Sequence, residues 1–294
     1  MRLFPSAALM FGVPMTLCLW SSPSLAAQQQ VDLKLVLAMD VSGSIDNDEL
    51  QLEREGTADA FLDPDVIKAI QNGSVGRIAV TMIDFSMPPY NKIVVDWHII
   101  RDRASAAGFA EIVRKTPRSL GHRTSISSAL ELGSLLLESS DKDITATRKV
   151  IDVSGDGANN AGSHMTTVHE KTVANGIIIN GLPVMDQQAN GYFPNLDKYY
   201  AACVAGGRGS FVVVVHNYKD YSVGMRRKLV LEISQNVTPI KQAQIIFLPE
   251  RPYVPVAAAS QLQGDRGSQI LPSAPNEFSK QCDNFSGPFS FGNF

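Results

Sequence analysis

The sequence predicts a three-layer α/β/α domain, an α/β fold with a mostly parallel central sheet and one antiparallel edge strand. Apolar runs of strand length alternate with amphipathic helical segments from residue 33 to residue 234, which is typical of α/β folds. The run 33–39 is almost entirely apolar, which indicates a strand buried on both faces of a parallel sheet. Two strands at 77–85 and 93–97 are separated by a short turn and predict a hairpin, whose second strand would be the antiparallel edge.

The helices are marked by their ends. Asp46 or Asn47 caps the first helix, with Asp48 and Glu49 favourably placed in its first turn. Gly176 marks the end of a helix that begins at residue 165. Helices are expected at 47–62, 66–71, 104–115, 124–138, 165–175, 196–204 and 221–234, and the remaining strands at 148–154, 177–182 and 211–215.

Composition narrows the classes of function. At 294 residues and 44% hydrophobic, the chain is long enough to bury one substantial core. A formal net charge of −3 gives no reason to expect nucleic acid or an anionic membrane as partner. Aromatic residues make up only 7%, too few for a stacking platform for single-stranded nucleic acid.

The first 26 residues read as a signal peptide. A short positive start precedes an apolar stretch over 3–20, and Ser24-Leu25-Ala26 places small residues before the cleavage point. A membrane anchor is the alternative, but Pro5 and Pro14 interrupt a run already shorter than the roughly 20 apolar residues that a span needs. We therefore expect export to the periplasm or the extracellular space, with no membrane span after cleavage.

Two cysteines remain once Cys18 leaves with the signal peptide. Cys203 and Cys282 are expected either to form an intramolecular disulfide, which an oxidising compartment permits, or to stay as free thiols. The second of them lies in a Pro-, Gln- and Ser-rich tail, residues 236–294, that we expect to be partly extended or disordered. Residues 245–248 could add an edge strand.

Oxygen-bearing side chains follow three widely separated segments. Asp40, Ser42 and Ser44 come directly after the first strand, Thr124 opens a later helix, and Asp156 follows the strand that ends at residue 154. Ligands of open α/β sheets bind at the carboxyl ends of the strands, and such oxygens suit a hard cation such as Mg²⁺. Each residue also has an ordinary interpretation, because Ser and Thr commonly cap helices and an Asp-Gly pair commonly forms a turn.

Together these five residues resemble the metal-ion-dependent adhesion site of the von Willebrand factor A (VWA) domain family, which has a Rossmann-like fold. The family pattern is Asp-x-Ser-x-Ser, then a distant Thr, then a distant Asp commonly followed by Gly. The resemblance covers residues 31–235. The runs at 150–157 and 227–233 are similar to an uncharacterised branch of the family found in secreted proteins of Gram-negative bacteria.

The resemblance implies a role for each residue. In the family the two serines and, in the ligand-bound state, the threonine coordinate the cation directly, while the aspartates often act through water. The cation is Mg²⁺, with Mn²⁺ or Ca²⁺ as alternatives, and it keeps one position for an Asp or Glu carboxylate of a protein partner. Loops around the metal set the binding face, here 46–49, 86–91, 118–123 and 183–194. The final helix, which moves on ligand binding in larger family members, corresponds to 221–234.

No nucleophile with a supporting base stands at a recognisable catalytic motif, so we predict a binding protein and no enzyme. His164 and His169 are five residues apart, which does not suit a helical zinc pair. Buried Asp152 is expected to pair with Arg148 or a loop amide. The sequence therefore predicts a secreted, divalent-cation-dependent protein-binding module for adhesion or assembly. Two alternatives stay open: a metal-dependent phosphoester or ester hydrolase, and a structural envelope protein stabilised by its metal.

Overall fold

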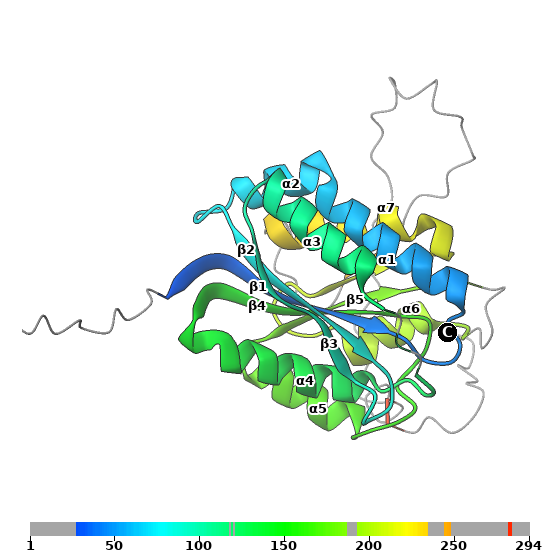
Figure 1. Cartoon of the computed structure of the whole chain (residues 1–294). Coiled ribbons are helices and arrows are strands. Elements are labelled where there is room, and N and C mark those ends of the chain that lie inside the picture. Colours follow the sequence, from blue (N-terminus) through cyan, green and yellow to red (C-terminus); the bar gives the residue numbers. More distant parts are fainter. Residues whose placement is uncertain are drawn as a thin grey trace, which may run out of the picture.

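The computed structural model describes residues 28–117, 119, 121–186, 193–234, 244–247 and 282–283. The predicted signal peptide and most of the predicted tail lie outside these residues. The described chain forms a central sheet between two layers of helices, which confirms the predicted three-layer arrangement (Figure 1).

The sheet has seven strands in the order β3-β2-β1-β4-β5-β6-β7. All pairings between these strands are parallel except β2 with β3, which is the predicted antiparallel edge. β7 pairs with β6 and confirms the expected edge strand near residue 245. The strands are β1 Gln29–Asp40, β2 Ile78–Phe85, β3 Lys92–Ile100, β4 Ile144–Gly155, β5 Ile178–Pro183, β6 Phe211–Val214 and β7 Gln244–Phe247.

Helices cover both faces of the sheet (Figure 1). One layer holds α1, α2, α3 and α7, and the other holds α4, α5 and α6 with the π turn η2. Short 3-10 turns η1 (Ser140–Lys142) and η3 (Tyr218–Asp220) precede β4 and α7. The helical bounds are α1 Asn47–Leu62, α2 Pro64–Gln71, α3 Arg103–Lys115, α4 Ile126–Ser139, α5 Met165–Ala174, α6 Leu196–Tyr199, η2 Tyr200–Val204 and α7 Tyr221–Ser234.

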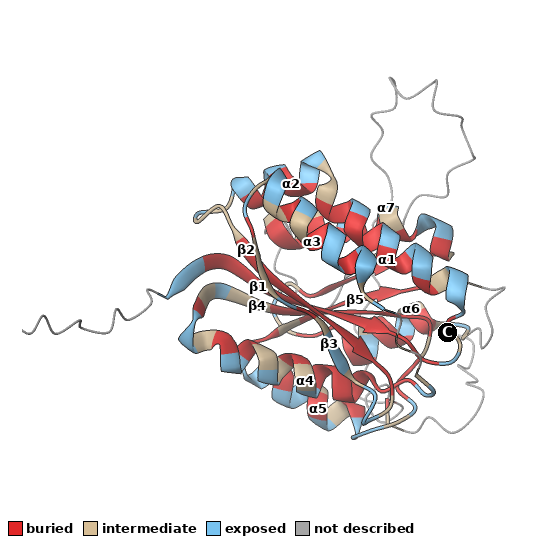
Figure 2. Cartoon of the chain, viewed as in Figure 1, coloured by how far each residue is buried: buried red, intermediate tan, exposed pale blue. Residues whose placement is uncertain are grey.

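Strand β1 lies at the centre of both cores because its side chains alternate between the faces. Leu33, Leu35 and Leu37 pack in the cluster under α1 and α7, while Val36 and Ala38 pack in the cluster under α4 and α5. All five are fully buried, and the strands form the buried interior in Figure 2. The continuous apolar run in the sequence therefore reflects burial on both faces.

Most predicted helix ends are confirmed. Asp46 caps α1 in a reciprocal capping box with Glu49, and Gly176 adopts a positive φ of 75° just beyond α5. Two expectations were wrong in detail. Thr124 does not open α4, because Ser125 is its N-cap and the helix begins at Ile126. The expected helix at 196–204 is divided into α6 and the π turn η2.

A buried polar network attaches α7 to the sheet. Lys228 forms an ion pair with Asp152 of β4, and its Nζ lies 3.9 Å from Glu232 Oε2. Glu232 also accepts a 2.7 Å hydrogen bond from the Asn180 side chain. The expected Asp152–Arg148 pair was wrong: Arg148 donates instead to the carbonyl oxygen of Glu232, at 2.7 Å. Burial lowers the pKa of Lys228 to about 8, against the opposing effect of Glu232.

Candidate metal centre

The carboxyl edge of the sheet brings the first and last predicted site residues together. β1 pairs with β4 in a register that sets Met39 opposite Ser154, so Asp40 ends one strand where the Asp156 turn begins on the next. The loop that carries Thr124 crosses the same edge. Three segments far apart in the sequence therefore supply one site.

The five predicted side chains lie in a single hydrogen-bonded group. Ser44 Oγ donates to Asp156 Oδ1 at 2.7 Å, and Ser42 Oγ lies 3.2 Å from Ser44 Oγ. Thr124 Oγ1 donates to Ser42 Oγ at 3.1 Å, and Asp40 Oδ1 accepts from the Ser42 backbone N–H at 2.8 Å. The three hydroxyl groups thus form a continuous chain of contacts from Thr124 to Asp156.

Ser86 fixes the loop that leads to Thr124. Its hydroxyl accepts from the His122 N–H at 2.9 Å and donates to the Arg123 carbonyl at 2.7 Å. The same loop is joined to the Asp40–Ser44 segment by Gly121 N–H to Val41 O, 2.7 Å, and by Gly43 N–H to His122 O, 3.1 Å. The sequence predicted that residues 86–91 form a turn and one loop of the binding face but gave Ser86 no part in holding Thr124, although its place directly after β2 was a signal.

Two asparagines connect the Asp156 loop to the Thr124 segment. Asn160 Oδ1 accepts from the Thr124 N–H at 3.0 Å, and the Asn160 N–H donates to the Thr124 carbonyl at 2.9 Å. Asn159 Oδ1 accepts from the Ser127 N–H at 2.9 Å. These bonds fix the position of Thr124 relative to Asp156.

The centre brings together three buried acids whose ionisation is unfavourable. Burial, and then the nearby charge of Asp156, raise the pKa of Asp40 well above its usual range. Burial raises the pKa of Asp156 to about 6, although the Ser44 hydroxyl opposes this effect. Glu53 of α1 accepts from Ser154 Oγ at 2.9 Å, and burial raises its pKa to about 8 despite the adjacent Arg54. A cation would offset the repulsion among these three acids.

The space and the donor atoms fit a small divalent cation. Asp40 Oδ2 is buried without a hydrogen-bond partner, and so is the Tyr200 hydroxyl. A Cβ atom on Gly155 would lie 2.9 Å from that Asp40 oxygen and 3.2 Å from Tyr200 Oη, and one on Gly157 would lie 3.0 Å from Thr124 Oγ1. Gly155 and Gly157 therefore leave room beside Asp40 and Thr124 in the space among the five predicted side chains, which we call the cradle. Hydroxyl and carboxylate oxygens are the ligands that hard cations prefer.

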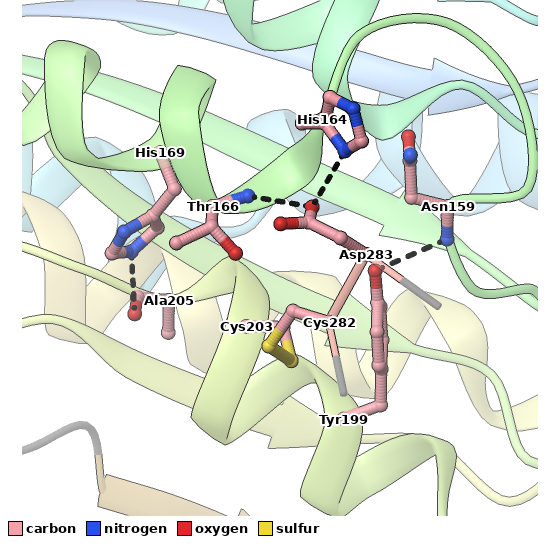
Figure 3. Close-up of a disulfide and its surroundings, with 9 residues drawn as sticks. All are labelled: Asn159, His164, Thr166, His169, Tyr199, Cys203, Ala205, Cys282 and Asp283. Atoms are coloured by element: carbon pink, nitrogen blue, oxygen red, sulfur yellow. Dashed lines mark hydrogen bonds and ion pairs between the residues drawn. A yellow bond between two sulfur atoms is a disulfide. The ribbon is translucent and has the colours of Figure 1, made fainter. Parts of the chain in front are cut away.

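Within the described residues, no group of three or more His, Cys, Asp or Glu side chains is arranged to hold a metal. A metal centre in this part of the chain consequently depends on serine and threonine oxygens. The two histidines considered earlier do not meet: His169 Nε2 lies 3.2 Å from the Ala205 carbonyl, while His164 lies beside Asp283 (Figure 3).

A family model described as "Protein of unknown function (DUF1194)" matches residues 30–237, which is most of the chain. The chain belongs to the DUF1194 family. No curated protein sequence gives a significant match to this DUF1194 chain.

Solved structures show which fold this DUF1194 domain has. Proximal thread matrix protein 1 from the mussel byssus is 16% identical with a TM-score of 0.52, covering 70% of this chain and 49% of its own. A von Willebrand factor type A protein from Catenulispora acidiphila is 12% identical with a TM-score of 0.50, covering 69% and 43%. The pilus adhesin SpaC from Lactobacillus rhamnosus GG is 14% identical with a TM-score of 0.50, covering 71% and 32%.

These likenesses confirm the predicted VWA, Rossmann-like fold. The DUF1194 chain aligns with less than half of the length of each of these proteins. None of its described helices is both long and apolar enough to cross a membrane.

Of the two alternatives for Cys203 and Cys282, the structure has the disulfide, and its surroundings include Asn159 of the loop after β4 (Figure 3). Asp283 accepts a 3.0 Å hydrogen bond from the Thr166 N–H and so caps the start of α5, where His164 offers no side-chain cap. Next to Cys203, the Tyr199 hydroxyl accepts from the Asn159 N–H at 3.2 Å. The disulfide thus fixes α6 and η2, the segment that contains Tyr199 and Tyr200, next to the loop that follows β4.

Gly155→Ala is expected to weaken metal binding by at least tenfold with little loss of secondary structure. The new methyl group would lie 2.8 Å from Asp40 Cβ and fill the space next to Asp40 Oδ2. Isothermal calorimetry with Mg²⁺ measures the effect. Gly108→Ala in α3 is the matched control, because its Cβ would meet only His98, at 3.7 Å, and alanine favours a helix interior. Equal Mg²⁺ affinity in both variants would contradict the proposed cradle.

Proposed function

We propose that this domain is a divalent-cation-dependent protein-binding module. Asp40, Ser42, Ser44, Thr124 and Asp156 hold Mg²⁺, or Mn²⁺ or Ca²⁺ in its place, and a partner's Asp or Glu carboxylate completes the site. The observation that carries the proposal is that five oxygen-bearing side chains form one hydrogen-bonded group, in which two buried acids have raised pKa values and Asp40 Oδ2 has no hydrogen-bond partner.

The hydroxyl groups, the aspartates and the supporting side chains have different roles in binding the cation. The three hydroxyl groups are neutral, so they orient a cation without cancelling its charge, and the cation supplies Lewis acidity toward an incoming anion. Asp40 and Asp156 retain the cation through their negative charge. The loops that carry Thr124 and Asp156 are held in place by Ser86, Asn159 and Asn160, whose side chains form hydrogen bonds to the backbone. The site provides recognition without requiring a nucleophile.

Export of the domain is part of the proposal. The leader-like residues 1–26 and the Cys203–Cys282 disulfide support a periplasmic or extracellular location. A pilus adhesin and a thread matrix protein of the mussel byssus share the fold. A role in adhesion or envelope assembly is consistent with these features.

Affinity capture from envelope extract, run in parallel with Mg²⁺ and with EDTA, tests the function. Wild-type protein should retain a partner only with Mg²⁺, and Asp40→Ala should retain none. If EDTA lowers the melting temperature but releases no captured partner, the metal is structural. If the protein turns over a generic phosphoester and Asp40→Asn abolishes that turnover, the hydrolase alternative replaces this proposal.

The stabilisation produced by Mg²⁺ should grow between pH 5 and pH 8. The folded protein raises the pKa of Asp156 from 3.8 to about 6 and that of Glu53 from 4.5 to about 8. From pH 3.8 to about 6 for Asp156, and from pH 4.5 to about 8 for Glu53, the folded state binds more protons than the unfolded state. The free energy of unfolding of the metal-free protein therefore falls as the pH rises through this window. Mg²⁺ competes with those protons, so its effect is greatest where they have left. Differential scanning fluorimetry from pH 5 to pH 8, with Mg²⁺ or EDTA, should show this divergence, and a constant difference would contradict it.

A further inference from the structure

We propose that the rim of the metal centre selects a bipolar partner segment: a metal-binding acid with a basic residue on one side and a second acid on the other. This inference rests on the proposed function and adds the charge order of the partner. Two groups of exposed residues carry it. The acidic flank comprises Asp48, Glu49 and Asp186, and the basic flank comprises Lys92, His122 and Arg123.

The acidic flank adjoins the Asp156 side of the centre. Asp48 is exposed, and Glu49 and Asp186 are partly exposed. Burial raises the pKa of Glu49, the hydrogen bond from the Asp46 backbone N–H opposes this effect, and the charges of Asp46 and Asp186 add to the rise. Glu49 also contributes to the raised pKa of Asp156, which places the flank next to the metal ligands. A basic residue of a partner would relieve the repulsion within this group.

The basic flank adjoins the opposite side of the centre. His122 and Arg123 are exposed in the loop whose backbone bonds to Gly43, and Lys92 is exposed at the start of β3. Neither Lys92 nor Arg123 forms an ion pair with another described residue. Tyr90, 46% exposed, packs edge-on against the His122 ring at 5.4 Å between centroids. This flank therefore offers cationic groups beside an aromatic surface.

The strand order sets Lys92 and Asp186 on opposite sides of the metal. Lys92 begins β3 and the 121–123 loop is anchored to Ser86 at the end of β2, whereas Asp186 follows β5. Asp40 and Asp156 lie between them, at the ends of β1 and β4. Neighbouring strands are about 4.8 Å apart, so the four spacings from β3 to β5 span roughly 19 Å. An extended segment of about six residues covers that distance.

The preference can be measured with synthetic seven-residue peptides that carry a central aspartate. Two bipolar peptides place a pair of glutamates and a pair of lysines on opposite sides, in either order. Two uniform peptides carry four glutamates or four lysines. Binding is followed by fluorescence anisotropy at low ionic strength with Mg²⁺ and with EDTA, because exposed charge pairs are screened by salt.

One bipolar order should bind about tenfold more tightly than either uniform peptide in Mg²⁺, since each exposed pair contributes up to about fivefold. The double variant Lys92→Glu/Arg123→Glu should shift the preference to the uniformly basic peptide. Lys142→Glu, an exposed change in the η1 turn before β4, is the matched control and should retain the wild-type order.

The outcomes separate this inference from the function on which it rests. If Mg²⁺ strengthens binding of all peptides equally, or if the double variant keeps the wild-type order, the charge selection is wrong while the metal-dependent function stands. If Mg²⁺ strengthens binding of no peptide, the proposed function and the charge selection both fail.

Discussion

Asp156→Asn is expected to abolish the Mg²⁺-dependent rise in melting temperature and to leave the metal-free protein at least as stable as the wild type. Asparagine keeps the oxygen that accepts the 2.7 Å bond from Ser44 but removes the charge that retains the cation. Mg²⁺ affinity should fall by roughly a hundredfold or more, which corresponds to about 2.7 kcal/mol.

The effect on the metal-free protein has the opposite sign. Ionising Asp156 in the folded protein is unfavourable because burial raises its pKa from 3.8 to about 6. At pH 8 the amide removes a cost on the order of 2–3 kcal/mol, an upper bound given the coupling to Asp40. Calorimetry gives the affinity, and urea unfolding in EDTA gives the stability. Asp143→Asn, an exposed change before β4, is the control and should alter neither quantity. An Asp156→Asn protein that still binds Mg²⁺ at wild-type affinity would remove Asp156 from the site.

Lys228→Met is expected to reduce the free energy of unfolding by about 3–5 kcal/mol. Methionine has a similar shape, but it leaves Asp152 without its ion-pair partner in the core and removes the cation 3.9 Å from Glu232 Oε2. Lys228 is fully buried, so water cannot replace the lost charge. Removing one member of a buried pair costs more than the pair itself contributes.

Two comparisons make this result interpretable. Arg226→Met changes the same helix at a partly exposed side chain, which lies 3.7 Å from Asp63 and 3.9 Å from Asp65, and should cost less than about 1 kcal/mol. The double variant Lys228→Met/Asp152→Asn should recover part of the loss, because it removes both charges of the pair. Urea unfolding at pH 7 measures all three. A loss below about 1 kcal/mol for Lys228→Met would show that the network under α7 has little effect on stability.

Local signals in the sequence were sufficient for much of the fold, and the resemblance to the VWA family pattern supplied the five proposed ligands. The apolar run before Asp40 predicted a central strand, and Asp46 with Glu49 predicted the start of α1, because burial and capping leave marks within a few residues. The spacing of Asp40, Ser42 and Ser44 identified one loop, the end of a strand placed Asp156 beside it, and the expected start of a helix placed Thr124 there. The structure brings all five together.

Contacts between distant segments could not be predicted from the sequence. Asp152 alternates with apolar residues in its strand, which indicates burial, but nothing near it points to Lys228 of α7. The same holds for Tyr200, whose hydroxyl reaches the space beside Asp40 from a π turn that follows a loop of irregular pattern. Packing between the layers determines which of these residues are neighbours, and no local pattern in a single sequence indicates it.

The disulfide makes a covalent ring of the last part of the domain. Cys203 and Cys282 are 79 residues apart, and the ring they close contains β6, α7 and β7. A protease that cuts a single peptide bond anywhere from residue 204 to residue 281 would therefore leave two chains that remain linked through sulfur. Asp283 would stay attached and continue to cap α5. Such a molecule keeps its two pieces together after a single cut, and gel electrophoresis with and without reductant would reveal the cut.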